Sequence, residues 1–255
     1  MHVVAIANQK GGVGKTTTAV NLAASLAVAE QRVLLVDLDM QGNASSGVGL
    51  SPRGVDVGTY QVLMDGVPVA EARQKTELEQ LHVLPASRDL AAIEIELYTS
   101  EDRNFRLREA LRAVEGEYDF VVIDCPPSLG LLTINALAAA ELVLVPLQCE
   151  YYALEGLSQL VDTIDRVRGN LNPGIRIHGV LLTMFDARNN LANEVAAEVR
   201  KHFPVYETMI PRNIRLAEAP SHGKPAILYD AASRGSYGYL NLAREILDAL
   251  PDAAA

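Results

Sequence analysis

The stretch that decides the fold is Gln9-Lys10-Gly11-Gly12-Val13-Gly14-Lys15-Thr16-Thr17-Thr18. An apolar run, Val3 to Ala7, precedes it, and an alanine- and leucine-rich segment, Ala19 to Ala29, follows it. This order of buried strand, glycine loop and helix is the context that a phosphate-binding loop requires. Small residues let backbone N–H groups converge on phosphate oxygens, and the positive end of the following helix points at the same place.

The side chains of the loop indicate how a nucleotide would bind. We expect Lys15 to neutralise charge on the outer phosphates and the hydroxyl of Thr16 to bind Mg²⁺. The expected cradle consists of Gly11, Gly12, Val13, Gly14, Lys15, Thr16 and Thr17. The alternative is a glycine turn before an ordinary core helix. That alternative does not explain why the glycines, the lysine, the threonine and the flanking strand and helix all occur in the order of a phosphate-binding loop.

The loop departs from the common pattern G-x-x-x-x-G-K-[ST], because Gln9 occupies its first glycine position and a second lysine, Lys10, follows. K-G-G-V-G-K-T-T resembles the deviant Walker A P-loop of the ParA/MinD superfamily of ATPases. This resemblance implies that Lys10 reaches across a nucleotide-sandwich homodimer to the ATP of the partner chain. Gly11 and Gly12 suit such an interface, where any Cβ would keep the subunits apart.

Two apolar runs end in aspartates that are candidates for catalysis and metal binding. Residues 32–37 have the continuous apolar character of a buried parallel strand, and Asp39 follows in the next loop. The carboxyl edge of such strands is where α/β sheets bind ligands. In the family this loop usually reads D-x-D-P-Q-G, and here Met40 replaces the proline. The resemblance implies that Asp39 orients or activates the attacking water, and the alternative is a solvated turn.

The second run, Phe120 to Ile123, ends in Asp124 and is stopped by two prolines. This is the form of a Walker B strand, so we expect Asp124 to hold Mg²⁺ through a water. We expect the adjacent Cys125 to be a small buried residue and not a catalytic thiol. A further buried strand, 142–147, leads to Glu150, which by resemblance faces the partner chain.

The C-terminal part matches the same family closely from Pro211 to Pro225. By resemblance, Pro211 and Asn213 hold the adenine through backbone groups and the asparagine amide. Arg188 and Arg215 stand in segments that match the family's DNA-binding positions, and Arg212 is a further candidate. Such arginines bind DNA through its phosphates and carry no sequence preference. A surface charge or a local salt bridge is the alternative for each arginine.

Composition and charge limit the class of protein. The 255 residues, 49% of them hydrophobic, suffice for one large α/β core, and two cysteines argue against a disulfide scaffold. No cationic leader precedes the first strand, and no apolar run reaches the about 20 residues that span a bilayer. We therefore expect a cytoplasmic protein. The net charge is −10, but residues 151–255 hold 11 Lys/Arg against 12 Asp/Glu, which leaves room for a basic surface there.

Strands alternate with helices along the whole chain. This pattern predicts an α/β fold with a three-layer, doubly wound, mostly parallel sheet, that of a P-loop NTPase of the deviant Walker A type. We expect one ATPase domain over 1–255, without the N-terminal helix-turn-helix extension of larger plasmid forms. Expected strands are 3–7, 32–37, 81–86, 120–123, 142–147 and 175–184, and expected helices are 59–64, 89–98, 105–114, 154–168, 193–202 and 233–250.

Over nearly its whole length the chain is similar to chromosomal ParA (Soj-type) partition ATPases. The resemblance implies Mg²⁺-dependent hydrolysis of ATP to ADP and phosphate, with weak basal activity. It also implies that the ATP homodimer binds double-stranded DNA non-specifically, and so associates with the nucleoid. A ParB-type partner would then trigger hydrolysis and release.

Three other functions are compatible with parts of the sequence. A MinD-like membrane-positioning ATPase would carry a basic amphipathic C-terminal helix, but the tail from Asp248 to Ala255 is acidic, so we expect no membrane partner. A nitrogenase iron-protein-like reductase needs two cysteines per subunit for a [4Fe–4S] cluster. Cys125 and Cys149 supply that number, although Cys125 adjoins the Walker B carboxylate. A nucleotide-switched scaffold without catalysis is the third.

Overall fold

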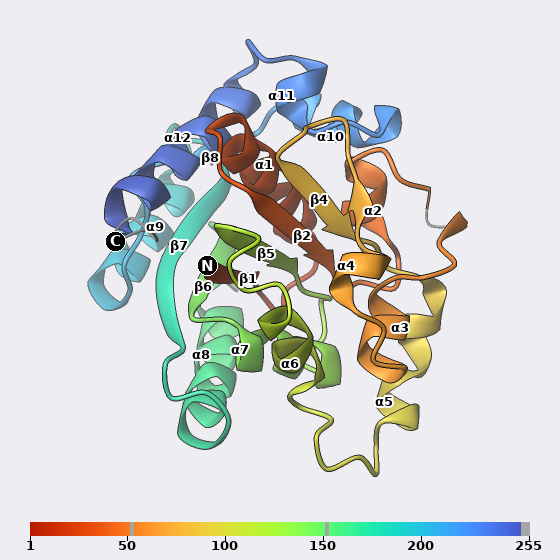
Figure 1. Cartoon of the computed structure of the whole chain (residues 1–255). Coiled ribbons are helices and arrows are strands. Elements are labelled where there is room, and N and C mark those ends of the chain that lie inside the picture. The colour runs from red at the N-terminus through yellow and green to blue at the C-terminus, as the bar shows by residue number, and fades with distance from the viewer. Residues whose placement is uncertain (52–53, 151–152, 251–255) are drawn as a thin grey trace.

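The computed structural model describes residues 1–51, 54–150 and 153–250. Over these ranges an eight-stranded sheet crosses the centre of the molecule in the order β3-β4-β2-β5-β1-β6-β7-β8 (Figure 1). Neighbouring strands are parallel except for β3, which pairs antiparallel with β4 at the sheet edge. The strands are β1 His2–Ile6, β2 Val33–Asp37, β3 Gln74–Lys75, β4 Leu81–Leu84, β5 Phe120–Asp124, β6 Leu142–Gln148, β7 Arg176–Phe185 and β8 Ile210–Pro211.

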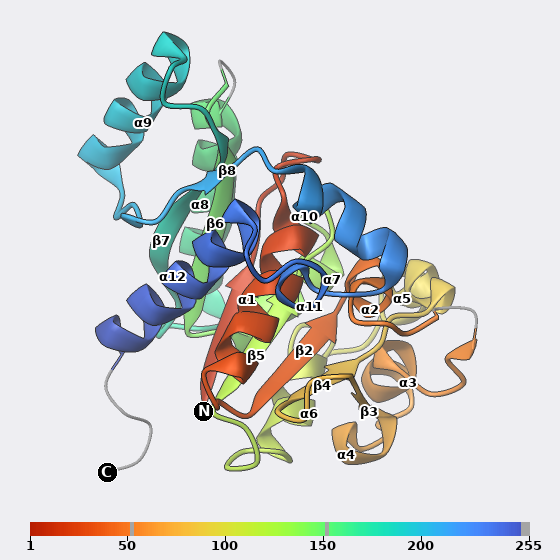
Figure 2. The ribbon, with the colours of Figure 1, turned by 90° about the horizontal axis from the view of Figure 1, so that it is seen from above.

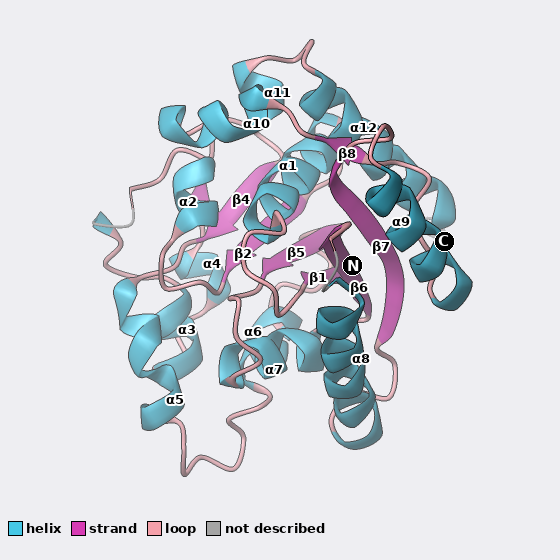
Figure 3. Ribbon diagram, turned by 180° about the vertical axis from the view of Figure 1, so that it is seen from behind, coloured by secondary structure: helices cyan, strands magenta, loops and turns pink. Residues whose placement is uncertain are grey.

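Helices cover both faces of the sheet and make it the middle of three layers (Figures 1 and 3). The N-terminal half contributes α1 Lys15–Val28, α2 Asn43–Gly47, α3 Thr59–Met64, α4 Val69–Ala72, η2 Arg88–Ala92, α5 Ile93–Glu96 and α6 Arg106–Arg112. The C-terminal half contributes α7 Leu131–Ala139, α8 Ala153–Asn170, α9 Asn190–His202, α10 Ile214–Glu218, η3 Ala219–His222, α11 Ala226–Tyr229 and α12 Arg234–Ala249. The expected doubly wound α/β fold is therefore confirmed.

Two apolar clusters form the core, one on each side of the sheet. One side buries α1 and α12, which lie next to each other (Figure 2). The other side buries apolar side chains of α3, α6, α7, α8 and α9. All residues of β2 and β5 are buried, because a parallel strand in an α/β sheet is covered on both faces. This explains their continuous apolar sequence and places their carboxyl ends together at one edge.

Most of the expected elements are confirmed, some of them to the residue. The helix at 59–64 has the expected bounds, and β5 extends the strand expected at 120–123 by one residue. The helix expected at 89–98 is instead a 3₁₀ turn, η2, followed by the short α5. Leu90, Ile93 and Leu97 are buried, but residues three or four apart share a face in an α-helix and in a 3₁₀ helix alike. Their spacing therefore did not distinguish the two kinds of helix.

The sequence did not reveal α7. Its residues, Leu131 to Ala139, are almost all apolar, and most are buried. A helix that is apolar on every side lacks the stripe from which amphipathic helices are recognised. The two-residue edge strands β3 and β8 are likewise too short to produce a periodic pattern.

Substituting Gly179 in β7 with alanine should destabilise the fold. A Cβ there would lie 2.7 Å from the ring of Tyr206, which is buried and whose hydroxyl is 2.5 Å from Nδ1 of His178. Because the ring has little room to move, we expect the free energy of unfolding to fall by about 1–3 kcal/mol. Urea denaturation measures this change.

The matched control is Gly169→Ala in α8, where a Cβ would meet no atom within 4 Å. Alanine favours the helix, so this variant should gain up to about 1 kcal/mol. Equal stability of the Gly179→Ala variant and the wild type would show that Tyr206 does not restrict this position.

Candidate functional site

The glycine loop joins β1 to α1 at the middle of the sheet. Gly12 and Gly14 have φ angles of +75° and +88°, a left-handed conformation that favours glycine. Gly11 has no positive φ, and a Cβ at Gly11 would meet nothing within 4 Å. The conformation of the chain therefore explains Gly12 and Gly14, whereas nothing in the described residues requires glycine at position 11.

Buried hydrogen bonds hold the loop against two neighbouring strands. The hydroxyl of Thr183 on β7 donates to the carbonyl of Val13 over 2.8 Å. The side chain of Asn8 donates to the carbonyl of Pro146 on β6 and accepts from the backbone N–H of Lys10. The loop is therefore fixed in position before any ligand binds, which is the arrangement that phosphate recognition requires.

A cavity of about 310 Å³ lies over the loop at the start of α1. It is lined by Gly11, Gly12, Gly14, Lys15, Thr16, Thr17, Asp39, Asn43 and Pro127. The fold thus gathers most of the expected phosphate-binding residues with Asp39, which follows β2. Backbone N–H groups at a helix start together with a lysine form an anion-binding environment.

Two buried carboxylates end the adjacent strands β2 and β5. Asp37 of β2 stands opposite Asp124 of β5 in the sheet register, and both are 0% exposed. Asp37 accepts hydrogen bonds from the backbone and hydroxyl of Ser45 and from the backbone of Asp39. Burial nevertheless raises the pKa of Asp37 to about 6.

Asp124 has no such partners. Both of its carboxylate oxygens are buried and accept no hydrogen bond from the described residues. Burial and then the charge of Asp37 raise the pKa of Asp124 well above its usual range, and the nearby Thr16 hydroxyl opposes the rise. A buried carboxylate beside a threonine hydroxyl, with its oxygens unsatisfied, fits a bound divalent cation.

Within the described ranges no three histidine, cysteine, aspartate or glutamate side chains gather as a metal cluster. A cation at Asp124 and Thr16 would therefore complete its shell with ligand oxygens and waters, as Mg²⁺ does in phosphate sites. Cys125 beside Asp124 is 1% exposed, and burial raises the pKa of its thiol. Cys149 is 7% exposed, and burial raises its thiol pKa to about 11, so both thiols are unreactive at neutral pH.

The two lysines of the loop face different surroundings. Lys15 is 7% exposed; burial lowers its pKa, and the charges of Asp124 and Asp39 oppose that shift. Its ammonium donates to the carbonyl of Lys10 over 3.1 Å. Lys10 instead donates from Nζ to the carboxylate of Glu150 over 2.6 Å, and its side chain is 32% exposed. Lys15 therefore lines the cavity, whereas Lys10 is held outside it by its own chain.

A second cavity of about 430 Å³ adjoins the first, since Gly12, Gly14 and Thr17 line both. Pro211 and Asn213, the residues expected to hold adenine, line this second cavity. The Oδ1 of Asn213 accepts from the backbone N–H of Arg215 and so caps α10. Only an oxygen can accept there, so the amide presents its NH₂ group as the free donor.

Thr183, Met184 and Tyr239 are among the residues of this cavity that the sequence did not predict. Met184 has a φ of +50° where the pairing of β7 with β8 breaks register, and such outliers gather at functional sites. Thr183 and Met184 lie near the carboxyl end of β7, at the edge where α/β sheets bind ligands. This position could have identified them as candidate site residues from the sequence. Tyr239 comes from α12, far away in the sequence, and carried no signal.

The three candidate arginines are exposed but differ in their partners. Arg188 pairs with Asp186 through two contacts of 3.0 and 2.9 Å. Arg215 pairs with both Glu218 and Asp230. Arg212 lines the second cavity and has no ion pair among the described residues. Arg188 precedes α9 and Arg215 lies on α10, which are separate elements in Figure 2.

No helix within the described residues has the length and apolar character needed to cross a membrane. Residues 151–152 and 251–255, which include the two tyrosines after Glu150 and the end of the acidic tail, lie outside the described residues.

Comparisons with known proteins show similarity over almost the whole chain. A sequence profile of the AAA domain family matches residues 1–177. The chromosome partitioning protein ParA of Myxococcus xanthus is 58% identical, covering 96% of this chain and 88% of that protein. The sporulation initiation inhibitor protein Soj of Bacillus subtilis is 57% identical, covering 96% of this chain and 97% of that protein. Cobyrinic acid a,c-diamide synthase from Mycobacterium smegmatis, solved with an ATP analog and magnesium, is 38% identical with a TM-score of 0.86, covering 97% and 94% of the two chains.

Replacing Asp124 with asparagine should stabilise the protein in the absence of nucleotide and metal. The substitution removes a fully buried carboxylate that stands opposite Asp37, so at about pH 8 the free energy of unfolding should rise by about 1–3 kcal/mol. The folded wild type binds protons more tightly than the unfolded chain at these raised-pKa carboxyls. The gap to the variant therefore narrows as the pH falls, because protonation removes the charge of Asp124 from the folded wild type, whereas the raised pKa of Asp37 acts in both proteins.

Urea denaturation in EDTA at about pH 8 and about pH 5 measures both effects. The control is Asp119→Asn, because hydrogen bonding to Arg32 lowers the pKa of Asp119 and that variant should lose stability at the higher pH. An Asp124→Asn protein that is less stable than the wild type at pH 8 would show that this carboxylate is not strained.

Proposed function

The chain belongs to the ParA/Soj family of chromosome partitioning proteins, and we propose that it is a Mg²⁺-dependent ATPase whose ATP-bound homodimer binds DNA. The observation that carries this proposal is the different orientation of the two loop lysines. Lys15 lines the phosphate cavity, and Lys10 lies outside it on Glu150. One chain thus supplies one cation to its own triphosphate and keeps a second that can serve another copy.

Two adjoining cavities support ATP, with ADP as the product. The smaller one, over the loop, suits the phosphates, and the larger one, at Pro211 and Asn213, suits the base. The NH₂ group of Asn213 would donate a hydrogen bond to a ring nitrogen of adenine, and a backbone carbonyl near Pro211 would accept one from the exocyclic amine. The relative from M. smegmatis was solved with an ATP analog and magnesium, which agrees with this assignment.

The residues below the phosphates suit Mg²⁺ and an attacking water. Thr16 would bind the metal directly and Asp124 through a water, which would satisfy the unpartnered oxygens of Asp124. Bound Mg²⁺ neutralises charge that develops on the phosphate oxygens. Asp39 lines the same cavity, so its carboxylate would orient the water for attack on the γ-phosphate. Lys15 would bind the outer phosphates throughout.

Efficient hydrolysis would require a second copy of the chain. The γ-phosphate gains charge in the transition state, and a further cation accelerates such reactions strongly. Lys10 of the partner chain would supply it, once its pair with Glu150 is broken. Both groups of that pair are partly exposed, so breaking it costs at most about 1 kcal/mol. The open space at Gly11 agrees with a partner chain placed against the loop.

DNA binding would follow from the pairing of two chains. Arg188, Arg215 and Arg212 are exposed, and arginines bind DNA phosphates without reading sequence. A dimer would double the number of phosphate contacts, so affinity should depend on ATP and decrease steeply with salt. We treat residues 1–255 as one ATPase domain, with nucleoid DNA and a ParB-type activator as its cytoplasmic partners and no membrane partner.

The variant Lys10→Ala should bind ATP within a few-fold of the wild type, because Lys10 lies outside the cavity of its own chain. It should fail to form an ATP-dependent dimer and to turn over ATP, since the partner's phosphates lose their additional cation. Equilibrium ATP binding and size-exclusion chromatography with light scattering measure the two properties. Lys201→Ala, a surface lysine paired with Glu198, is the control. An intact ATP dimer of Lys10→Ala would refute the role of Lys10.

Substituting Asp39 should separate assembly from hydrolysis. Asp39→Ala is expected to accumulate a stable ATP dimer, because the phosphates still bind but no carboxylate orients the water. Asp39→Asn retains the hydrogen bond from the backbone N–H of Gln41 and should behave in the same way. Phosphate release and light scattering follow the two properties. If Asp39→Asn hydrolyses ATP normally while Asp39→Ala does not, Asp39 shapes the loop and does not act on water.

A further inference from the structure

Two carboxylates bind the side chain of Arg215 on α10. Its Nη1 donates to Glu218 Oε2 over 2.8 Å, and its Nε lies 3.2 Å from Asp230 Oδ2. The side chains of all three residues are partly exposed, at 46%, 36% and 34%. Hydrogen bonding and the charge of Glu218 raise the pKa of Arg215, so the guanidinium stays charged. We name this group of three residues the Arg215 clamp.

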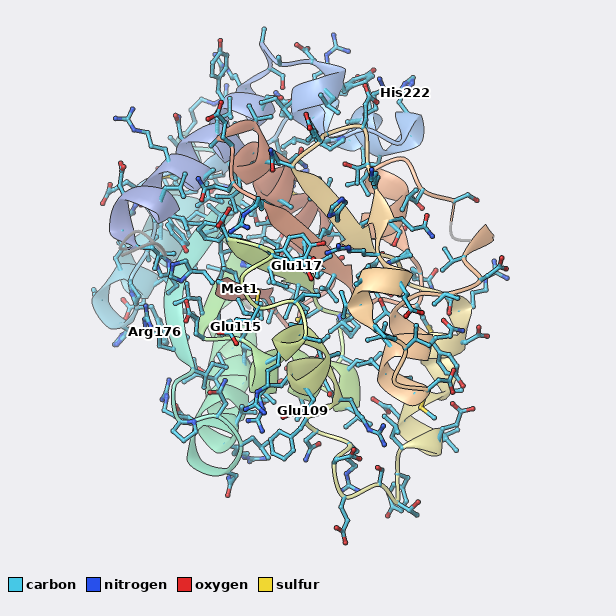
Figure 4. All side chains as sticks on the ribbon, in the orientation of Figure 1. Met1, Glu109, Glu115, Glu117, Arg176 and His222 are labelled. Carbon is cyan, nitrogen blue, oxygen red and sulfur yellow. The ribbon has the colours of Figure 1, made fainter. Side chains whose placement is uncertain are left out.

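The acids of the Arg215 clamp are held in place by their own neighbours. The hydroxyl of Tyr229 donates to Glu218 over 3.3 Å, and the ring of Tyr229 stacks on His222 with centroids 4.8 Å apart. Asp230 ends α11: its backbone N–H donates to the carbonyl of Ala226, and its side chain accepts from the backbone of Ala232. His222 marks this edge of the molecule in Figure 4.

A DNA phosphate that approaches Arg215 therefore meets two negative charges beside the guanidinium. It must replace at least one carboxylate, or bind next to both and be repelled. Arg188 has one acidic partner, Asp186, whereas Arg212 has none among the described residues. Of the three candidate arginines, Arg215 is thus the one whose guanidinium contacts two carboxylates among the described residues.

We propose that Glu218 and Asp230 weaken the contact of Arg215 with DNA phosphates, so that DNA is bound appreciably only by two chains together. This inference rests on the proposed function, since it concerns the DNA contact of the same dimer. A nucleotide can switch DNA binding through dimerisation only if one chain alone binds weakly. The clamp provides that weakness in each chain without removing the arginine.

The test uses Asp230→Asn, which retains the bond from Ala232 and removes one charge from the clamp. Binding to a fluorescent duplex of random sequence is followed by anisotropy with ATP, with ADP and without nucleotide. Breaking one exposed ion pair should tighten binding about two- to fivefold. Binding without nucleotide should tighten by this factor, and binding with ATP should tighten by more, because both chains of the dimer carry the substitution. Glu218→Gln, which still accepts from Tyr229, should act in the same direction.

Asp248→Asn is the matched control, because it makes the same charge change beside Arg244, an exposed arginine on α12. It should leave DNA affinity unchanged, and Asp230→Asn should give no gain in an Arg215→Ala background. Equal gains in the two asparagine variants, or a gain that persists without Arg215, would overturn the clamp. If the wild type with ATP does not bind DNA at all, the proposed function fails. If it binds and Asp230→Asn changes nothing, only the clamp fails.

Discussion

The register between β2 and β5 places two carboxylates opposite each other in a space that excludes water. Asp37 and Asp124 are paired Cα to Cα, both fully buried, with Lys15 close enough for its charge to act on Asp124. The two charges are close because the neighbouring strands β2 and β5 both end in aspartate and parallel strand ends meet at one edge of the sheet. The repulsion between the two buried carboxylates destabilises the fold, and a bound cation with phosphate would reduce it. Sites that bind charge often carry such a penalty.

The remaining features of the site follow from how this edge is completed. The loop after β1 is bound to β6 and β7 through Asn8 and Thr183, so its glycines and Lys15 face the carboxylates. Lys10, five residues before Lys15, is directed to Glu150 at the end of β6. The same loop thus presents one cation inward and one outward. We propose that Lys10 acts on the ATP of a second chain, so hydrolysis requires a dimer. We also propose that the ion pairs of Arg215 weaken the binding of DNA by a single chain.

Much of the fold could be predicted because its signals are local. The run Phe120 to Ile123 ending in Asp124 identifies a buried strand and its carboxylate from five residues, and the glycine loop identifies the following helix. Family and fold are confirmed by the relatives and by the sheet. The uniformly apolar α7 could not be predicted from periodicity. Met184 and Tyr239 line the base cavity through tertiary packing, and Asp230, the second partner of Arg215, comes from the end of another helix. The roles assigned to individual site residues stay predictions.

If each chain completes the site of the other, mixing two inactive variants should restore hydrolysis, and this is the most direct test. A Lys10→Ala chain keeps Asp39, and an Asp39→Ala chain keeps Lys10, so a mixed dimer contains one pocket with both groups. Phosphate release is measured for each variant alone and for their mixtures at several ratios, with ATP and Mg²⁺. We expect almost no turnover for either variant alone and clear recovery on mixing, highest near equal amounts. Mixtures that remain as inactive as their components at every ratio would contradict this expectation.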